Sequence, residues 1–182
     1  MVINPKNSQK IMAWGVEMAI GLLFDATVAL GNKIAKTGLF EYFKEEVSEG
    51  DAKNSQISKT IYELKRKGYI QFEGDSVKLT NKAKMKIVDK ITAELGTSKK
   101  YHLISFDIPE IKRQNRNGFR RAIKKMGFVQ IQKSLWVTTK NAGELVETAA
   151  EEYGVGDYVA YFVSEKSNID EYIAKIINKS SK

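Results

Sequence analysis

The chain has 182 residues, of which 42% are hydrophobic and 29% charged, as expected for one large soluble domain or two small ones. It contains no cysteine, which excludes disulfides, thiolate zinc sites and cysteine nucleophiles. Its single histidine, His102, leaves little basis for a histidine-rich metal site or a catalytic triad. The formal net charge of +8 favours a polyanionic partner, although a generic lysine-rich surface would give the same excess.

The first recognisable element is an apolar run from Ile11 to Phe24, which we expect to form a helix within residues 1–30. The run includes Glu17 and is shorter than the ~20 apolar residues that a membrane-spanning helix requires. The residues on either side form a poor signal-peptide pattern. We therefore expect a core helix, packed within the following domain or extending a dimer interface, in a cytoplasmic protein with no membrane partner.

Residues 31–96 carry the pattern of a helix-turn-helix. A first helix is expected around an apolar stripe at 39–43. The second runs from an N-cap at Asn54 or Ser55 to Gly68, a residue type that is common just after a helix ends. Its apolar residues recur at i, i+4 and i+7 and therefore share one face. These residues are Ile57, Ile61 and Leu64.

A short hairpin is expected after the second helix. The segments "YIQFEG" and "VKL" are strand-like, and "GDS" between them favours a turn. Thr80 is then a suitable N-cap for a helix over "NKAKMKIVDKITAEL". Helix, turn, helix, hairpin and a following helix is the order of a winged helix-turn-helix, a motif that binds double-stranded DNA.

The outward face of the second helix has suitable chemistry for DNA binding. At about 100° per residue, the face opposite the apolar residues combines hydroxyl groups, cations and an aromatic ring, which contact phosphates and base edges in a major groove. The hairpin would act as a wing on backbone phosphates. A solvated helix rich in lysine and arginine would look similar. The predicted DNA-binding residues are Ser55, Ser58, Lys59, Tyr62, Arg66 and Lys67 on the helix and Lys78 on the hairpin.

The pattern changes after a polar segment, "GTSKK" at 96–100, which we interpret as a linker. Residues 101–166 then alternate strand and helix patterns in the order β-α-β-β-α-β, which is the ferredoxin-like module. Residues 167–182 supply a C-terminal helix and a charged tail. The sequence therefore predicts an α+β protein, with an N-terminal winged helix-turn-helix followed by a ferredoxin-like βαββαβ domain. The first helix of that domain should bury Ile111, Phe119, Ile123 and Met126.

The same helix carries a second basic cluster, and no acid lies between Lys112 and Lys125. Two interpretations are equally open. The cluster could grip nucleic acid, or it could be a solvated face that pairs with the acidic helix Glu144–Glu152, for instance within a dimer. Its members are Lys112, Arg113, Arg116, Arg120, Arg121, Lys124 and Lys125.

Asp107 follows the first strand of the module and is either a metal ligand or a turn residue. Magnesium prefers octahedral oxygen ligation, and the nearest other acid is Glu110, so one chain supplies too few carboxylates. A symmetric dimer could bring two copies of Asp107 to one metal ion. The structural interpretation is favoured, in which Asp107 accepts backbone N–H bonds in the turn that Pro109 stiffens, near the positive end of a helix.

Several motifs in this module resemble a known family. They are the strand and turn Phe106–Pro109, the basic helix after it, and the strand-pair residues Gly127-Phe128, Gln132, Ser134 and Trp136-Val137. The stretch from Tyr101 to Ser164 resembles the central domain of PaaX-type transcriptional repressors. That domain is itself similar to the small CRISPR adaptation nuclease, CRISPR-associated protein two. The resemblance implies that the module dimerises and that Asp107 is the position to test for metal.

The leading hypothesis is a homodimeric, sequence-specific DNA-binding transcriptional regulator of PaaX-like type, acting as a repressor with no catalytic residue and no cofactor. The winged helix favours it, because the small CRISPR protein resembles the ferredoxin-like module alone. The alternative is an endonuclease in which paired Asp107 side chains hold Mg²⁺ or Mn²⁺. A third interpretation is a protein-interaction adaptor that uses the apolar helix at 11–24 as its partner surface.

Overall fold

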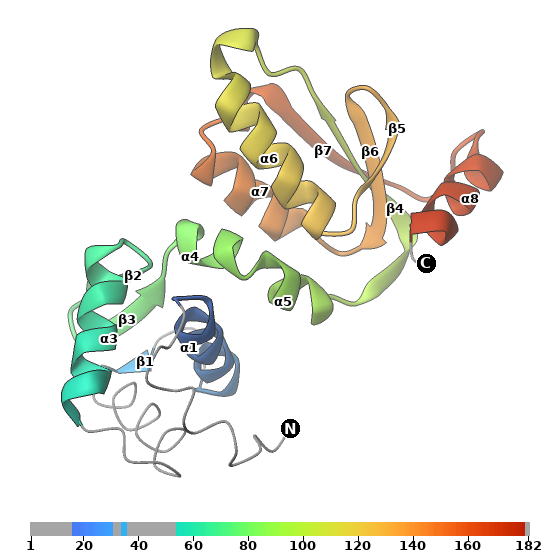
Figure 1. The fold of residues 1–182 in the computed structure, drawn as a ribbon. Helices are drawn as coiled ribbons and strands as arrows, with labels where there is room; N and C mark the ends of the chain where they lie inside the picture. Colours follow the sequence, from blue (N-terminus) through green and yellow to red (C-terminus); the bar gives the residue numbers. More distant parts are fainter. Residues whose placement is uncertain (1–15, 31–33, 36–53, 181–182) are drawn as a thin grey trace. The chain divides into compact units, whose positions relative to one another are not determined.

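The computed structural model of the chain describes residues 16–30, 34–35 and 54–180. Within these ranges the fold is mixed α+β, with one antiparallel sheet of three strands and another of four (Figure 1). The chain divides into two compact units, Met1–Ile87 and Val88–Lys182. The helix predicted around 39–43 and residues 11–15 of the apolar run lie outside the described residues.

Helix α1, Val16–Leu30, is a core helix of the first unit. It packs against helix α3 (Asn54–Arg66), helix α4 (Asn81–Lys86) and strand β3 (Ser76–Leu79). Four of its apolar side chains are almost completely buried, as the interpretation of this run as a core helix requires. They are Ala19, Ile20, Leu23 and Ala26.

Helix α1 extends beyond the apolar run, whose last residue is Phe24. Asp25 lies half-buried inside α1, and the helix continues to Leu30. The polar side chain of Thr27 is accommodated because its hydroxyl donates a hydrogen bond of 2.7 Å to the Phe24 carbonyl one turn earlier. Asp25 does not end this helix, because buried apolar residues lie both before it, at Leu23, and after it, at Ala26.

The three-stranded sheet has the order β1-β3-β2, with all neighbours antiparallel. Strand β2, Ile70–Glu73, and β3 form the predicted hairpin. Strand β1, Ile34–Ala35, pairs with β3 through the register partners Ile34 and Val77. The sequence did not predict β1, because two residues are too few to show an alternating pattern.

Helix α3 ends as the sequence predicted. Gly68 has a φ of 72°, the left-handed conformation that glycine adopts without strain. The N–H of Tyr69 donates to the Leu64 carbonyl at 2.9 Å and closes the last turn. Ile57 and Leu64 are buried with 3% and 2% exposure, and Ile61 is half-buried, so the predicted apolar face packs inward.

Thr80 caps the next helix as predicted, since its hydroxyl accepts the N–H of Ala83 at 3.3 Å. The single helix predicted over 81–95 is wrong, because it breaks at Ile87, whose φ of −114° and ψ of 24° are not helical. Helix α5, Val88–Ala93, follows the break. Ile87 stays 6% exposed, so the apolar periodicity continues through the break and does not reveal it.

The second unit confirms the predicted β-α-β-β-α-β order. Its sheet has the strand order β5-β6-β4-β7, and all neighbours are antiparallel. Short 3-10 turns precede helix α6 and strand β7. The elements are β4 Thr97–Phe106, α6 Arg113–Lys125, β5 Val129–Gln132, β6 Leu135–Lys140, α7 Gly143–Glu152 and β7 Val159–Ser164.

Strand β4 begins at Thr97 and not at Tyr101. Thr97 pairs with Lys140 of β6, and the register shifts before His102. The predicted linker at 96–100 is therefore wrong over 97–100. Most of these polar side chains are exposed, so their composition reflects a solvated strand end and not a break between elements.

Helices α6 and α7 pack together and cover one face of the four-stranded sheet (Figure 1). Ile111 is 93% exposed, so its predicted core position is wrong. The reason is the 3-10 turn Glu110–Lys112, which places Ile111 out of phase with the α-helix that follows. The other predicted core positions are confirmed at 0% exposure for Phe119, Ile123 and Met126.

Helix α8, Asp170–Ser180, covers the opposite face of this sheet. There Ile173 is 1% exposed and packs with Leu103 of β4 and Val137 of β6. The predicted C-terminal helix is thus confirmed, whereas residues 181–182 of the predicted tail lie outside the described residues.

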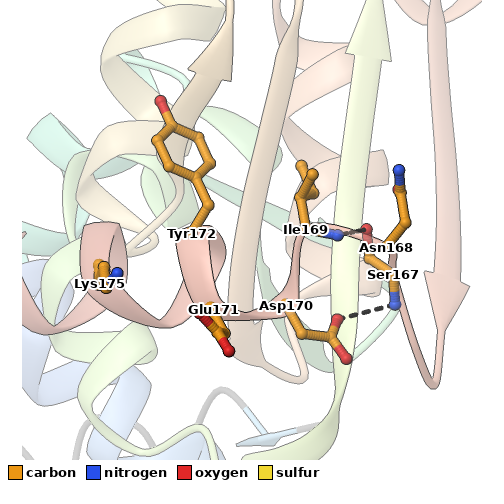
Figure 2. A pocket seen from close by; sticks show the side chains of 7 residues that line it. All are labelled: Ser167, Asn168, Ile169, Asp170, Glu171, Tyr172 and Lys175. Carbon is orange, nitrogen blue, oxygen red and sulfur yellow. Dashed lines mark hydrogen bonds between the residues drawn. The ribbon is translucent and has the colours of Figure 1, made fainter.

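A reciprocal cap fixes the start of α8 (Figure 2). A carboxylate oxygen of Asp170 accepts the N–H of Ser167 at 2.7 Å, and the hydroxyl of Ser167 accepts the N–H of Ile169 at 3.2 Å. This is the S-x-x-D form of a capping box, which satisfies backbone donors at the first turn of a helix. The cap explains why α8 starts here although the sequence shows no break in polarity.

Candidate nucleic-acid interface

The outward face of α3 presents a hydroxyl, a cation and an aromatic ring to solvent. Ser58 and Lys59 are exposed, and Tyr62 has 63% of its surface exposed. Within the described part of the chain, neither Lys59 nor Tyr62 has a hydrogen-bond or ion-pair partner. The backbone of Ser55 belongs to the first turn of α3, but its side chain falls outside the described residues.

Glu63 changes the other end of this face. Two nitrogens of Arg66 donate to its carboxylate at 3.1 and 2.8 Å, and the ammonium group of Lys67 lies 3.7 Å away. The hydrogen bond from Arg66 lowers the pKa of Glu63, and the same contact raises the pKa of Arg66. Arg66 and Lys67, two of the predicted DNA-binding cations, therefore share one acid along the helix.

The sequence interpretation overlooked Glu63. An acid at i with cations at i+3 and i+4 is a known helix-surface pair, so the spacing of Glu63, Arg66 and Lys67 could have predicted the contact. An exposed pair of this kind contributes little to stability. Phosphates can therefore replace Glu63 as partners of these cations at a small cost.

The β2–β3 hairpin lies beside α3 and supplies one further predicted residue. Lys78 forms an ion pair of 2.5 Å with Glu73, which lies diagonally across the two strands. The ammonium group of Lys65 lies 5.0 Å from the centre of the Phe72 ring. That contact joins the end of α3 to β2, and the helix packs beside the hairpin.

Asp107 is an exposed residue at the end of β4. Its backbone N–H donates to the Tyr158 carbonyl at 3.1 Å, which extends the pairing of β4 with β7 by one residue. Its carboxylate has no hydrogen-bond partner within the described residues. Over the same residues, no three histidines or acids gather in a way that could hold a metal ion.

The acid nearest to Asp107 in sequence is already paired. Glu110 accepts a hydrogen bond of 2.8 Å from Arg116, and Arg113 lies 3.7 Å away. The hydrogen bond from Arg116 lowers the pKa of Glu110. Arg116 also donates to the Ile108 carbonyl at 3.2 Å, so this arginine ties the turn after Asp107 to α6.

The basic cluster of α6 has partners on several other segments. Lys125 pairs with Asp89 of α5 at 2.8 Å, and Lys112 donates to the Gly154 carbonyl at 2.7 Å. Together with the pairing of Arg116 and Glu110, these contacts anchor both ends of α6. Arg121 and Lys124 lie between these anchors and are exposed.

A comparison with known families assigns the second unit. Residues 96–175 match the family model described as the PaaX protein central Cas2-like domain. This segment is similar to a PaaX-type central domain. The match runs from β4 into α8 and confirms the resemblance that the turn at Asp107 and the strand pair after α6 suggested. No curated protein and no solved structure gave a significant match to the chain.

Among the described residues, no helix combines the length and the apolar character that crossing a bilayer requires. Helix α1 has the most apolar sequence pattern of those discussed, and it is only 15 residues long.

Proposed function

We propose that this protein is a DNA-binding transcriptional regulator of PaaX-like type, acting as a repressor. The observation that carries the proposal is the order of parts. A segment similar to a PaaX-type central domain follows a unit in which α3 packs beside a β-hairpin. In the proposed regulator, residues 31–96 form a winged helix-turn-helix and the Cas2-like domain pairs two copies of the chain.

The topology of the first unit supports the winged-helix assignment. A short strand before α3 joins the far side of the hairpin, giving the sheet order β1-β3-β2 behind the helix. Helix α1 packs against both α3 and the sheet. This arrangement buries Ile57 and Leu64 and leaves the opposite face of α3 free to enter a major groove.

Each exposed group on α3 has a proposed role. Lys59 supplies an unpaired cation for a phosphate or a guanine edge, and Tyr62 supplies a ring and a hydroxyl near the centre of the helix. Arg66 exchanges Glu63 for a phosphate on binding. Lys78 on the hairpin contacts the backbone beside the groove.

The Cas2-like domain is the proposed dimerisation domain, as the family resemblance implies. Two α3 helices related by a two-fold axis would read two half-sites of a pseudo-palindromic operator. Sedimentation equilibrium with duplex titration gives the stoichiometry directly. A complex of one chain per operator would contradict the dimeric arrangement but not DNA binding by α3.

The central test is a gel-shift titration at several salt concentrations with a duplex selected from genomic fragments. We expect Lys59→Ala to weaken binding about five- to tenfold, roughly 1–1.4 kcal/mol, and to reduce the salt slope by about one. Lys179→Ala, an equal charge loss at an exposed position of α8, is the matched control and should stay within about twofold. Equal affinities for these two variants would contradict the assignment of α3.

A metal-dependent nuclease is the second candidate, and the exposed, unpartnered carboxylate of Asp107 favours it. Two copies of Asp107 across a dimer axis would hold Mg²⁺ or Mn²⁺. Labelled DNA and RNA incubated with Mg²⁺ would be cleaved by the wild-type chain and not by Asp107→Ala. Absence of cleavage at high protein concentration would remove this candidate and leave the regulator untouched.

A further inference from the structure

A pocket of about 260 Å³ lies between α6 and the β5–β6 hairpin of the Cas2-like domain. None of the residues that line it is acidic. Three are cations, and the other three each carry an N–H group that can donate a hydrogen bond. The lining residues are Asn117, Arg120, Arg121, Lys124, Gln130 and Trp136.

Both walls of the pocket follow from regular secondary structure. Asn117, Arg121 and Lys124 are spaced i, i+4 and i+7 on α6, so they lie on one stripe, with Arg120 beside it. Gln130 of β5 and Trp136 of β6 are register partners, so their side chains point to the same face of the sheet. That face is the one that α6 covers, which brings the two sets together.

Two buried donors at the pocket have no acceptor. Trp136 is 2% exposed, and its indole Nε1 has no hydrogen-bond partner within the described residues. The Nε of Arg120 is also buried and has no hydrogen-bond partner within the described residues. Both groups are donors only, and a buried donor without an acceptor is unfavourable. An anion bound in the pocket would bring acceptor oxygens beside this wall.

The cations are also held in place before any ligand arrives. The guanidinium of Arg120 lies 5.5 Å from the centre of the Phe106 ring, and its Nη2 donates to the Lys133 carbonyl at 3.5 Å. The ammonium group of Lys124 lies 5.8 Å from the centre of the Trp136 ring. Aromatic faces thus position two positive charges over the pocket.

We propose that this pocket binds a phosphate group, carried either by a nucleic-acid backbone or by a small phosphorylated ligand. The volume is below the range of about 300–1,000 Å³ that is usual for complete drug-sized ligands, and it suits one anionic group. Arginine and lysine beside neutral N–H donors are the groups that bind phosphate oxygens most strongly. The site is independent of α3 and does not rest on the proposed regulator function.

The indole N–H of Trp136 reports on the pocket by NMR, with its resonance assigned from Trp136→Phe. We expect inorganic phosphate, titrated at constant ionic strength against chloride, to shift this resonance to saturation. The double variant Arg121→Gln/Lys124→Gln should raise the Kd at least about tenfold, since it removes two charge-assisted contacts. Lys125→Gln is the matched control and should stay within about twofold, because Lys125 lies on the same helix but pairs with Asp89.

The variants are expected to fold, because Arg121 and Lys124 are exposed, and unchanged amide spectra would verify this. A phosphate shift that does not saturate, or that has the same Kd in the double variant and in Lys125→Gln, overturns the proposal.

A second arm identifies the source of the phosphate. If a DNA duplex shifts the indole resonance and the double variant abolishes the shift, the ligand is a nucleic-acid backbone. If phosphate shifts it and the duplex does not, the ligand is a small phosphorylated molecule. Lys59→Ala should leave the phosphate titration unchanged, so failure at α3 and failure at this pocket are distinguishable.

Discussion

Helices α3 and α6 are both basic, but their cations are arranged in opposite ways. In α3, Glu63 lies one turn before Arg66 and Lys67 and pairs with both along the helix surface. Helix α6 has no acid of its own, and its end residues reach partners on other segments. Its central cations, Arg121 and Lys124, instead line a pocket of donors.

This difference matters because charge content alone does not say what a basic helix binds. Arg66 pairs with an exposed acid, and such a weak ion pair can be replaced by a contact with a DNA phosphate. Replaceable contacts of this kind suit a surface that binds the DNA backbone transiently. Cations fixed over aromatic rings around unpaired donors, as Arg120 is, suit one anion in one place.

The largest effect is expected from removing the support beneath α6. Phe119 is 0% exposed and its ring meets Phe106 edge-on at a centroid distance of 5.5 Å. Phe119→Ala should lower the free energy of unfolding by about 3–5 kcal/mol, measured by urea denaturation. Ile111→Ala, at 93% exposure, is the control and should change it by less than about 0.5 kcal/mol. A large loss for Ile111→Ala would mean that this side chain is covered in solution.

A smaller effect is expected where α6 approaches the end of α7. A Cβ atom at Gly118 would lie 2.5 Å from the Tyr153 ring, too close for any contact without movement. Gly118→Ala should therefore lower the free energy of unfolding by about 1–3 kcal/mol. Adding Tyr153→Ala removes the clash, so the double variant should lose less stability than the two single variants combined. Simple additivity would show that the ring moves aside freely.

On α3, the corresponding test removes the acid that its cations share. Glu63→Gln frees Arg66 and Lys67 and should tighten duplex binding about two- to fivefold. The control is Glu144→Gln, the same change at an exposed position of α7. Gel-shift titrations of the two variants side by side give the difference. Equal affinities would show that Glu63 does not compete with DNA.

The smallest effect is expected from lowering the pH, which should decrease the stability of the second unit. The only histidine of the chain, His102, lies in this unit. His102 is 5% exposed and hydrogen-bonded to the Tyr161 hydroxyl, and burial lowers its pKa below the usual 6.5. As pH falls below about 6.5, the unfolded chain takes up a proton before the folded one, so stability decreases.

Urea midpoints followed by the Trp136 indole resonance, which reports on the second unit, provide the measurement. Between pH 7.5 and pH 5.5 the wild-type midpoint should fall more than that of His102→Gln. Burial also raises the pKa of Tyr161, so that hydroxyl stays neutral throughout this range. Parallel pH dependence in the two proteins would assign the loss to carboxylates elsewhere.

Much of the second unit could be predicted from the sequence because its patterns are long. Ten residues of β4 and thirteen of α6 give periodicity enough to identify each element. Short features could not be predicted in this way. Strand β1 has two residues, and the break at Ile87 keeps the apolar spacing intact, so neither produces a signal. Ile111 was misplaced because one 3-10 turn shifts its phase.

The candidate sites divide in the same manner. The exposure of Lys59 and Tyr62 could be predicted, since helical spacing alone places them opposite Leu64. The pocket on α6 could not, because it combines a helix with a strand pair that only the folded sheet brings beside it. The position of Asp107 at the end of β4 could be predicted from the motif, and the cleavage assay tests its role.

The packing of α8 on the sheet determines where a truncated form of the Cas2-like domain can end. Ile169, Ile173 and Ile177 all pack against the face formed by Leu103 and its neighbours. A fragment that stops at 164, after β7, would expose this apolar face to water and should aggregate during expression. A fragment that continues through 180 keeps the face covered. The last helix is therefore part of the smallest piece that can be produced for crystallisation or NMR.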